Sequence, residues 1–191
     1  SFLLHPCTGM CSSDGIGLIA GHLPLTFGMR RIAATLAVVG ALLYSAASAW
    51  ADFDDGVEAY NSGDYATALQ EFRPLAEQGD AKAQFNLGFM YDNGKGVPEN
   101  DAEAAKWHRK AAEQGDVMAQ YSLGGMYFRG EGVSQNFTEA VKWFRKAAEQ
   151  GDAYAQVNLG FMYGTGEGVP MNYVKAYMWY SLAKAQGNED A

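Results

Sequence analysis

The sequence predicts an all-α solenoid, a row of antiparallel helix pairs with about eight helices in total. The first observation is a period: the pentapeptide Ala-Glu-Gln-Gly-Asp begins at Ala76, Ala112 and Ala148, so the chain repeats every 36 residues. The second is that two glycine-containing breaks divide each period into two segments of helical length. The third is that apolar residues recur at helical spacing within those segments.

Each pentapeptide ends in Gly-Asp, which predicts a very short connection between two helices. Glycine is favoured just after a helix because it adopts a positive φ at no steric cost, and aspartate is favoured as the N-cap of the next helix. A second break, Gly-x-Gly-Val, begins at Gly94 and recurs 36 and 72 residues later. After it, Asn100 with Glu103 resembles a capping box, as does the equivalent pair one period on. The third period has Lys175 in place of the glutamate, which predicts a weaker cap there.

Constant positions define the face that we expect in the core. In the second helix of each period, small and large residues alternate along one stripe, so that neighbouring helices can interlock. In the first complete period this stripe is Ala104, Trp107, His108 and Ala111. In the middle of the first helix, Gly88 and its two equivalents each cost roughly 1 kcal/mol relative to alanine. We expect close helix approach there, because a side chain would hold the pair apart.

The constant positions form the pattern A-x-A-Q-x-x-L-G-x-M-Y, followed by G-x-G-V, A-x-x-W and K-A-A-E-Q-G-D. This pattern resembles the Sel-one-like repeat (SLR), a relative of the tetratricopeptide repeat. The resemblance implies a right-handed superhelix of antiparallel helix pairs. It divides the chain into a tetratricopeptide-like entry unit and three repeats, which span residues 52–79, 80–115, 116–151 and 152–187.

The N-terminal part has the features of a bacterial secretory signal peptide. A basic start at 29–31 precedes an apolar run at 32–43, and small residues follow up to Ala51. The run has 12 residues, against the roughly 20 that a spanning helix needs, so a retained membrane anchor is the lesser alternative. We predict a signal peptide over 29–51 and a periplasmic or secreted protein without stable membrane insertion after cleavage. Residues 1–28 are expected to be an upstream non-native or disordered segment.

The C-terminal helix differs from its equivalents on its outer face. Within residues 172–186, Met178, Ser181 and Leu182 stand where the first complete period has charged residues. The end of a solenoid needs a polar cap, and this face is apolar. We therefore expect residues 188–191 to be the truncated start of a C-terminal cap, and we expect self-association through the uncapped helix.

Composition and residue types argue against several classes of function. The chain has 22 acidic and 14 basic residues and a net charge of −8, which disfavours nucleic acid as a partner because nucleic acid requires basic patches. Both cysteines, Cys7 and Cys11, lie in the upstream segment, so the repeats offer no thiol for catalysis or metal binding. The repeats contain a single histidine, His108, which is expected to be a packed ring and not a general base. We predict no catalytic residue, no metal site and no cofactor.

The positions that vary between periods predict the interaction surface. They lie on the first helices, nearly opposite the constant stripe that contains Ala83, Leu87 and Tyr91. In the tetratricopeptide arrangement the first helices line the concave side, so a row of aromatic and methionine residues there resembles a binding surface. The same rings could instead pack against neighbouring first helices, and the sequence leaves both alternatives open. The candidate partner-binding residues are Lys82, Phe85, Phe89, Met118, Tyr121, Phe128, Tyr154 and Phe161.

We therefore expect a non-enzymatic scaffold that binds a peptide or helical segment of an unknown protein in an aromatic concave groove. The alternative is a periplasmic cell-wall-associated enzyme, or a peptidoglycan- or β-lactam-binding accessory protein, as the resemblance implies for some relatives. An enzyme of that kind requires a carboxylate pair in the groove, and the groove positions contain one acidic residue, Asp92. The relatives linked to β-lactam binding carry one disulfide per repeat, whereas the repeats here have no cysteine.

Overall fold

The computed structural model describes residues 52–187, so the segments 1–28, 29–51 and 188–191 lie outside the described residues, and their assignments stay predictions. Within 52–187 the regular secondary structure is entirely α-helical, which confirms the predicted all-α solenoid. The eight helices of this part are α2 (Phe53–Ser62), α3 (Tyr65–Gln78), α4 (Ala81–Asp92), α5 (Asp101–Glu113), α6 (Val117–Arg129), α7 (Phe137–Glu149), α8 (Ala153–Thr165) and α9 (Tyr173–Ala185).

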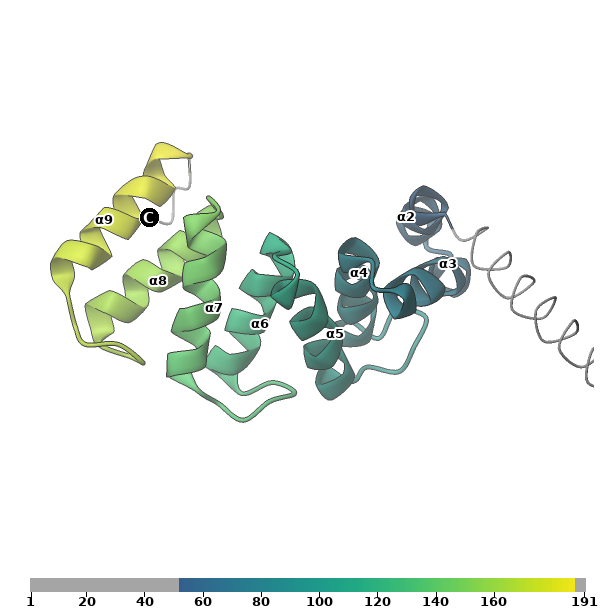
Figure 1. Ribbon diagram of the computed structural model, residues 1–191, viewed down its shortest axis with the longest axis horizontal. Coiled ribbons are helices and arrows are strands. Elements are labelled where there is room, and N and C mark those ends of the chain that lie inside the picture. Colours follow the sequence, from purple (N-terminus) through teal and green to yellow (C-terminus); the bar gives the residue numbers. More distant parts are fainter. Residues whose placement is uncertain (1–51, 188–191) are drawn as a thin grey trace, which may run out of the picture. The chain divides into compact units, whose positions relative to one another are not determined.

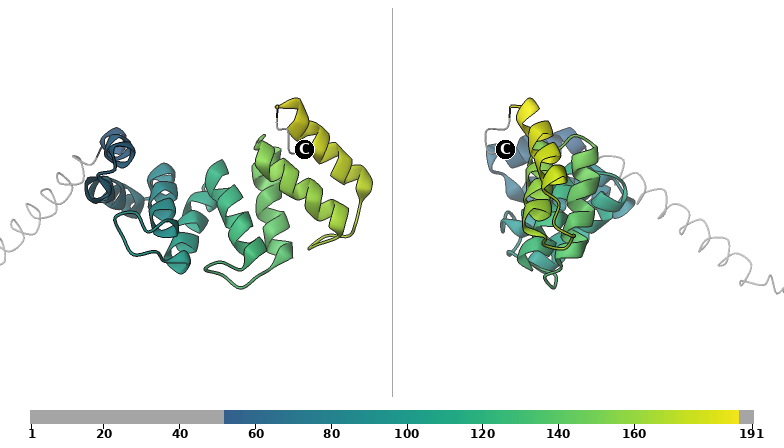
Figure 2. Two further views of the ribbon diagram at one scale, coloured as in Figure 1. Left: turned by 180° about the vertical axis from the view of Figure 1, so that it is seen from behind. Right: turned by 90° about the vertical axis from the view of Figure 1, so that its left-hand side faces the viewer.

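The helices follow one another in a single row, from α2 to α9 (Figure 1). Each helix packs mainly against its neighbours in the sequence, and the contacts are most extensive within the pairs α2–α3, α4–α5, α6–α7 and α8–α9. The reverse view of Figure 2 shows the same succession of pairs. Because extensive contacts join only consecutive helices, the core is a chain of small clusters and not one globular centre.

The Gly-Asp connections form as the sequence predicts. The glycine of each connection between repeats, at positions 79, 115 and 151, has a φ between 97° and 103°. The aspartate that follows it accepts a hydrogen bond from the backbone N–H three residues on, at 2.6–2.8 Å. These bonds satisfy one of the N–H groups that the first turn of a helix leaves without a partner. Two residues therefore suffice to end one helix and begin the next.

The asparagine caps also form, but the reciprocal half of the capping box does not. Asn100 accepts a hydrogen bond from the Glu103 backbone N–H at 3.0 Å. Its own backbone N–H donates to the carbonyl of Tyr91 at 3.0 Å, which leaves the Glu103 carboxylate out of the cap. Asn172 makes the same bond to the Lys175 backbone N–H at 2.9 Å. The predicted weakness of the third cap is therefore wrong, because the bond uses the backbone of that residue and not its side chain.

The close helix approach expected at the mid-helix glycines is present. A Cβ placed on Gly124 would lie 2.7 Å from Cδ1 of Phe144, and one on Gly88 would lie 2.8 Å from Nδ1 of His108. Carbon atoms in favourable contact lie about 3.5–4.0 Å apart. The equivalent glycine of the last repeat is also close to a ring, with a Cβ distance of 3.1 Å. In each repeat the ring of the second helix thus lies directly on the backbone of the first.

The Gly-x-Gly-Val loops join each repeat to the unit before it. A Cβ on Gly96 would lie 2.6 Å from the carbonyl oxygen of Tyr65, at the start of α3. The second glycine of each later loop lies in the same way against the first backbone carbonyl of α5 or α7. A larger residue would separate the loop from that helix. The loops are therefore packing elements between units.

A buried glutamine at the start of each first helix connects it to its neighbours, a role that sequence patterns alone did not reveal. The Nε2 of Gln84 donates to the carbonyl of Ala76, near the end of α3, at 3.0 Å. Its Oε1 accepts a hydrogen bond from Gln114 Nε2 at 2.8 Å, and both contacts recur in the later repeats. The same carbonyl of Ala76 also accepts the N–H of Gly79 at 3.1 Å, so the glutamine is its second donor, and the bond gives the buried side-chain amide a partner.

Two adjacent glycines of α6 provide a matched test of this packing. Gly124→Ala is expected to lower the free energy of unfolding by about 1–3 kcal/mol, because the new methyl group overlaps the Phe144 ring. Gly125→Ala is expected to raise it by up to about 1 kcal/mol, because alanine favours the helix and its methyl group meets only the flexible end of Arg129. Chemical denaturation of both variants measures the difference. Equal effects would contradict the close-approach role.

Candidate interaction surface

The eight predicted binding residues lie on the first helices of the three repeats. We call the face that they form the groove row. Helix α4 contributes Lys82, Phe85 and Phe89, α6 contributes Met118, Tyr121 and Phe128, and α8 contributes Tyr154 and Phe161. Four large members of the groove row, Phe89, Met118, Tyr154 and Phe161, are 40–61% exposed. Exposed apolar side chains gathered on one face are typical of interaction sites.

The half-buried members of the groove row pack against core rings. The Phe85 ring lies 5.5 Å from the His108 ring, between centroids, and the Tyr121 ring lies 5.9 Å from that of Phe144. Tyr121 also contacts the next repeat, with its ring 6.2 Å from that of Tyr154. These separations are typical of stabilising aromatic pairs. Within one row, the inner rings pack against the core while the outer side chains remain accessible.

Three cavities open along the groove row. One of about 340 Å³ lies between α2 and α4 beside Tyr60 and Phe89. A second, of about 250 Å³, lies among α4, α6 and α8, and a third, of about 590 Å³, lies between α8 and α9 beside Phe161 and Tyr180. Burial raises the pKa of Tyr60 and of Tyr180 above the ordinary value of about 10. Both phenols therefore stay protonated and able to donate hydrogen bonds at neutral pH.

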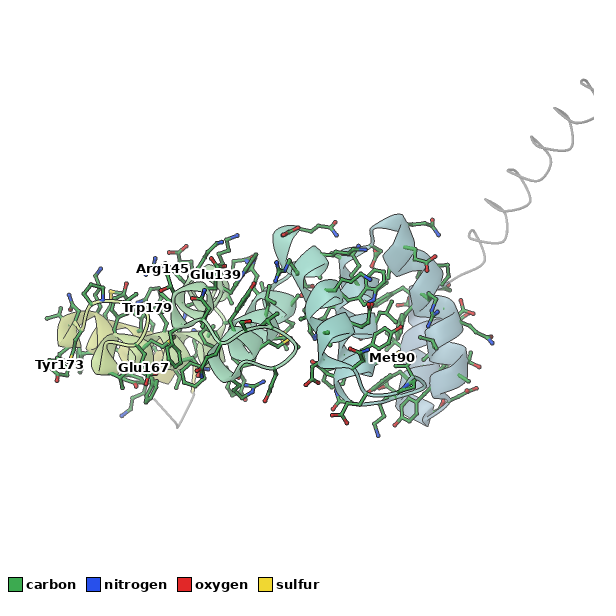
Figure 3. All side chains as sticks on the ribbon, turned by 90° about the horizontal axis from the view of Figure 1, so that it is seen from below. Met90, Glu139, Arg145, Glu167, Tyr173 and Trp179 are labelled. Carbon is green, nitrogen blue, oxygen red and sulfur yellow. The ribbon has the colours of Figure 1, made fainter. Side chains whose placement is uncertain are left out.

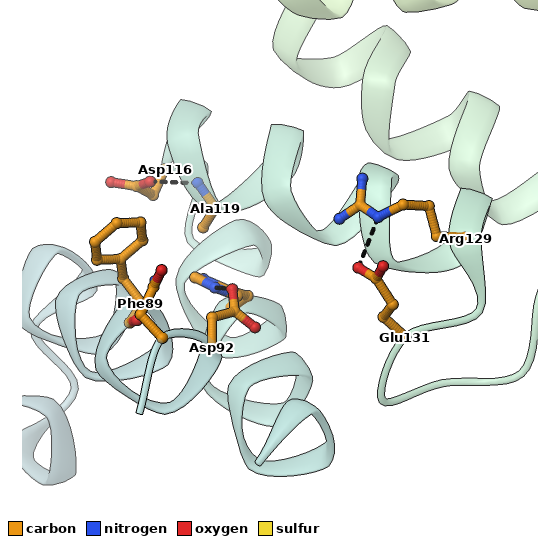
Figure 4. Close-up of polar contacts among 8 residues, drawn as sticks. Phe89, Asp92, Asp116, Ala119, Arg129 and Glu131 are labelled. Carbon is orange, nitrogen blue, oxygen red and sulfur yellow. Dashed lines mark hydrogen bonds and ion pairs between the residues drawn. The ribbon is translucent and has the colours of Figure 1, made fainter. Parts of the chain in front are cut away.

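The central cavity is distinguished by its polar lining. Gly125 stands where the other two repeats have Phe89 and Phe161, so the row of large side chains is interrupted there. Arg129, at the end of α6, donates from Nε to Oε2 of Glu131 at 2.6 Å, as Figure 4 shows. The polar residues that line this cavity are Asp92, Ser122, Arg129 and Asn158.

His108 is a packed core ring, as the sequence predicts, and it has a partner that the sequence did not indicate. Its side chain is fully buried, and Nε2 lies 3.0 Å from Oδ2 of Asp92. Nδ1 has no hydrogen-bond partner and faces Gly88. A buried N–H without an acceptor is costly, so the ring carries its proton on Nε2 and donates it to Asp92. Asp92 lies 16 residues away, at the end of α4, and only the fold brings the two together.

The part of the chain that the structure describes contains neither a cluster of metal-ligating side chains nor a membrane-spanning helix. Residues 52–187 contain no group of three or more metal-ligating side chains placed to hold an ion. None of their helices combines the length and the apolar character needed to cross a bilayer.

The outer face of α9 is apolar, and no other helix of residues 52–187 covers it. Tyr177 is 76% exposed, whereas Val141, its equivalent in α7, is 3% exposed beneath α8. Val174, Met178 and Leu182 are also exposed and follow each other at intervals of four residues, which places them on one stripe. Figure 3 shows Tyr173, at the start of this helix, projecting from the end of the row. The helix carries two lysines and no acidic residue.

Three consecutive matches to the Sel1 repeat family cover residues 81–116, 117–152 and 153–188. The chain belongs to the Sel1 repeat family. Each matched unit begins one residue after the unit delimited on the Gly-Asp pairs, at the first position of a helix. Sel1 repeats are helical scaffolds for protein–protein interaction, and the family is generally non-enzymatic.

Solved structures of Sel1 repeat proteins share the fold. A protective antigen of uropathogenic Escherichia coli strains is 45% identical, with a TM-score of 0.69, over 71% of this chain and 30% of its own. A Sel1 repeat protein from Oxalobacter formigenes is 40% identical, also with a TM-score of 0.69, over 72% of this chain and 56% of its own. Cysteine-rich protein B of Helicobacter pylori, at 23% identity and a TM-score of 0.53, shares the fold alone.

The curated relatives match over a short segment. DAP3-binding cell death enhancer 1 of rat and that of mouse are both 37% identical to the chain over 49 residues. This segment is 26% of the chain and 10% of either relative. The chain thus spans about a tenth of their length, and the similarity concerns the repeat and not the whole protein.

The Asp92–His108 pair gives a test of its structural role. Asp92→Ala is expected to lower the free energy of unfolding by about 1–3 kcal/mol, because it leaves the buried His108 Nε2–H unpaired. Adding His108→Phe, the residue that the second repeat has at this position, should recover most of that loss. Thermal or chemical denaturation of the single and double variants completes the cycle. An Asp92→Ala variant as stable as the parent would contradict the pairing.

Proposed function

We propose that this Sel1 repeat protein binds a peptide or helical segment of a partner protein along the groove row. The observation that carries the proposal is the set of four large apolar side chains, 40–61% exposed, beside three cavities on one face. Burying a large apolar side chain contributes about 1.5–3 kcal/mol, so a segment that covers several of them gains substantial affinity. Aromatic side chains supply such area at little entropic cost because they have few rotatable bonds.

The proposed function requires no chemistry of bond formation or cleavage. Asp92 is the one acidic side chain at the groove positions, and it is engaged by the buried His108. A general acid and a general base must both reach the substrate. The arrangement therefore favours binding over the cell-wall enzyme or β-lactam-binding alternative.

We also propose that the protein is exported from a bacterial cell through a signal peptide over residues 29–51. The support is the basic, apolar and small-residue succession in that segment, together with the similarity of the repeats to a protein described as a protective antigen. N-terminal sequencing of the protein from cell fractions tests this. A chain recovered from the cytoplasm with residues 29–51 still attached would contradict it.

Replacing the exposed groove side chains should abolish binding without unfolding the protein. We expect the combined variant Phe89→Ser, Tyr154→Ser and Phe161→Ser to lose at least tenfold in affinity for peptides selected on the parent from a displayed random library, since about 1.4 kcal/mol corresponds to a factor of ten. Its helical circular dichroism should stay close to that of the parent, and its unfolding midpoint should fall only modestly, because the side chains are partly exposed but pair with the neighbouring rings of Tyr60, Tyr121 and Phe128.

Tyr173→Ser is the matched control for the groove variant. Tyr173 is 69% exposed but lies on α9, outside the groove row. The Tyr173→Ser variant should bind the selected peptides with the same affinity as the parent. Equal losses in the control and the combined variant, or unchanged affinity in both, would contradict binding along the groove row.

The uncovered face of α9 supports a second proposal, self-association of the chain through this helix. Val174, Tyr177, Met178 and Leu182 form an apolar surface at helical spacing, and apolar surface of this kind is removed from water by association. The equivalent positions of Met178 and Leu182 in α5 and α7 are all lysines. Two of those lysines lie over tryptophan rings, at 4.0 and 4.3 Å from the ring centroid.

Restoring the lysine pattern should therefore suppress self-association. The variant Met178→Lys with Leu182→Lys is expected to sediment as a monomer at concentrations where the parent associates, with unchanged helicity. A control that adds the same charge at two exposed positions elsewhere, Ala102→Lys with Ser134→Lys, should associate like the parent. A parent chain that stays monomeric at every concentration would contradict self-association through α9.

A further inference from the structure

The central cavity of the groove row has the chemistry of a cation site. We propose that it binds the ammonium or guanidinium group of a lysine or arginine side chain of the partner segment. The proposal rests on the proposed peptide-binding function and specifies which side chain the middle repeat selects. The cavity measures about 250 Å³ and lies among α4, α6 and α8. That volume is below the 300–1,000 Å³ typical of small-molecule pockets, and it suits a single side chain.

Asp92 supplies the negative charge of this site, and a hydrogen bond from the buried His108 ring fixes the orientation of its carboxylate. One carboxylate oxygen, Oδ2, accepts a hydrogen bond from the fully buried Nε2 of His108 at 3.0 Å. The side chain is 29% exposed, and Asp92 lines the cavity. A carboxylate held by a buried donor does not have to be ordered when the ligand arrives, which lowers the entropic cost of binding.

Two neutral side chains add acceptors beside the carboxylate. The Nδ2 of Asn158 donates to the carbonyl of Tyr154 at 2.9 Å, so its Oδ1 is the atom left to accept a hydrogen bond from a ligand. The hydroxyl of Ser122 also lines the cavity. A lysine ammonium has three donors, and the carboxylate, amide and hydroxyl groups of these lining residues can each accept a hydrogen bond.

Three aromatic residues also line the cavity. Tyr121, Phe128 and Phe144 line the same cavity. The face of an aromatic ring attracts a cation because the ring carries negative charge density there, and the attraction is strongest where water is excluded. The aliphatic stem of lysine or arginine also packs well against rings. An anion gains neither of these interactions.

Arg129 is the cavity's one positively charged lining residue, and its charge is compensated. Its Nε donates to Glu131 at 2.6 Å, and its side chain is 55% exposed to solvent. In Figure 4 the Nε of its guanidinium faces Glu131, whereas the two terminal nitrogens point away, and the nearer one lies 3.0 Å from where a Cβ of Gly125 would be. Asp92 is held by a ring that donates one proton and carries no charge in that tautomer. Asp92 and Arg129 line the cavity, and Glu131, which pairs with Arg129, adds a second negative charge next to it, so these three side chains together carry one net negative charge.

Gly125 explains why this site occurs in the middle repeat alone among the three. The other two repeats have phenylalanine at this position, and a ring there would fill the space over the polar groups. The equivalents of Asp92 in the later repeats are Phe128 and Gly164, so the carboxylate is also unique to this place. The site arises where two departures from the repeat pattern, one on α4 and one on α6, come together.

The test uses charge changes of opposite sign at the same cavity. A randomised peptide library displayed on phage is selected on the parent chain, and binding of the recovered peptides is measured on three proteins: the parent, Asp92→Asn and Arg129→Gln. We expect lysine or arginine to be enriched at one peptide position, with affinity at least tenfold weaker for Asp92→Asn and equal or tighter for Arg129→Gln. Replacing that peptide residue by norleucine should remove the difference between the parent and Asp92→Asn.

The outcomes separate the two proposals. If no peptide binds the parent chain, or if bound peptides are insensitive to the exposed groove residues, the groove function itself fails. If peptides bind through those residues but show no basic enrichment, or bind Asp92→Asn as tightly as the parent, only the cation site fails. Enrichment of aspartate or glutamate, with binding lost in Arg129→Gln, would replace the cation site by an anion site. Unfolding midpoints of both variants close to that of the parent ensure that the affinities compare folded proteins.

Discussion

The structure depends on the contact between a mid-helix glycine and the aromatic or histidine ring that the partner helix places on it. A Cβ on Gly88 or Gly124 would lie closer to such a ring than real Cβ atoms do, and one on Gly160 would lie 3.1 Å from its ring, a tight contact. This contact sets how closely the two helices of a repeat approach, and it fixes which face of the first helix is buried. The opposite face must then be exposed or covered by a neighbour. The groove row is therefore a consequence of the same packing that stabilises each repeat.

Polar bonds keep successive repeats in register while apolar contacts supply most of the stability. The buried glutamines bridge the end of one second helix, the start of the next first helix and the following repeat. Their partners are backbone carbonyls and other glutamines, which recur at a fixed separation of 36 residues. Because buried polar groups tolerate few alternative partners, these bonds make a shifted pairing of repeats costly. A solenoid built from nearest-neighbour contacts needs such a device, since no distant contact corrects an error.

Function is expected where the repeats differ. The positions that pack between helices are nearly invariant from one period to the next, whereas those on the groove row change in size and charge. Phe89 and Phe161 are matched by Gly125, and Asp92 is matched by Phe128 and Gly164. On α9 the change is of another kind, because apolar residues replace the lysines that cover the equivalent faces of α5 and α7. The two surfaces proposed for interaction both arise from departures from one shared pattern.

Much of the fold was predictable from the sequence. The period of 36 residues, the Gly-Asp connections and the stripe that contains Trp107 and His108 follow from local rules of helix capping and helical periodicity. The groove residues could also be placed on one face, because that face is the side opposite the core. Even the role of the mid-helix glycine could be anticipated, since glycine within a helix requires a compensating contact.

The local rules of helix capping and periodicity could not predict which side chains on separate helices contact one another. The pairing of Asp92 with His108, the polar lining that Asn158 adds to the central cavity and the partition of the groove row into packed and exposed rings were decided by the tertiary structure. The capping-box prediction failed for the same reason, because a tertiary hydrogen bond to Tyr91 occupies the donor that Glu103 would have used. By itself, the sequence determined the repeating scaffold, because capping and periodicity act over a few residues. The tertiary structure decided the site, because its groups come from helices whose separation depends on the packing between them.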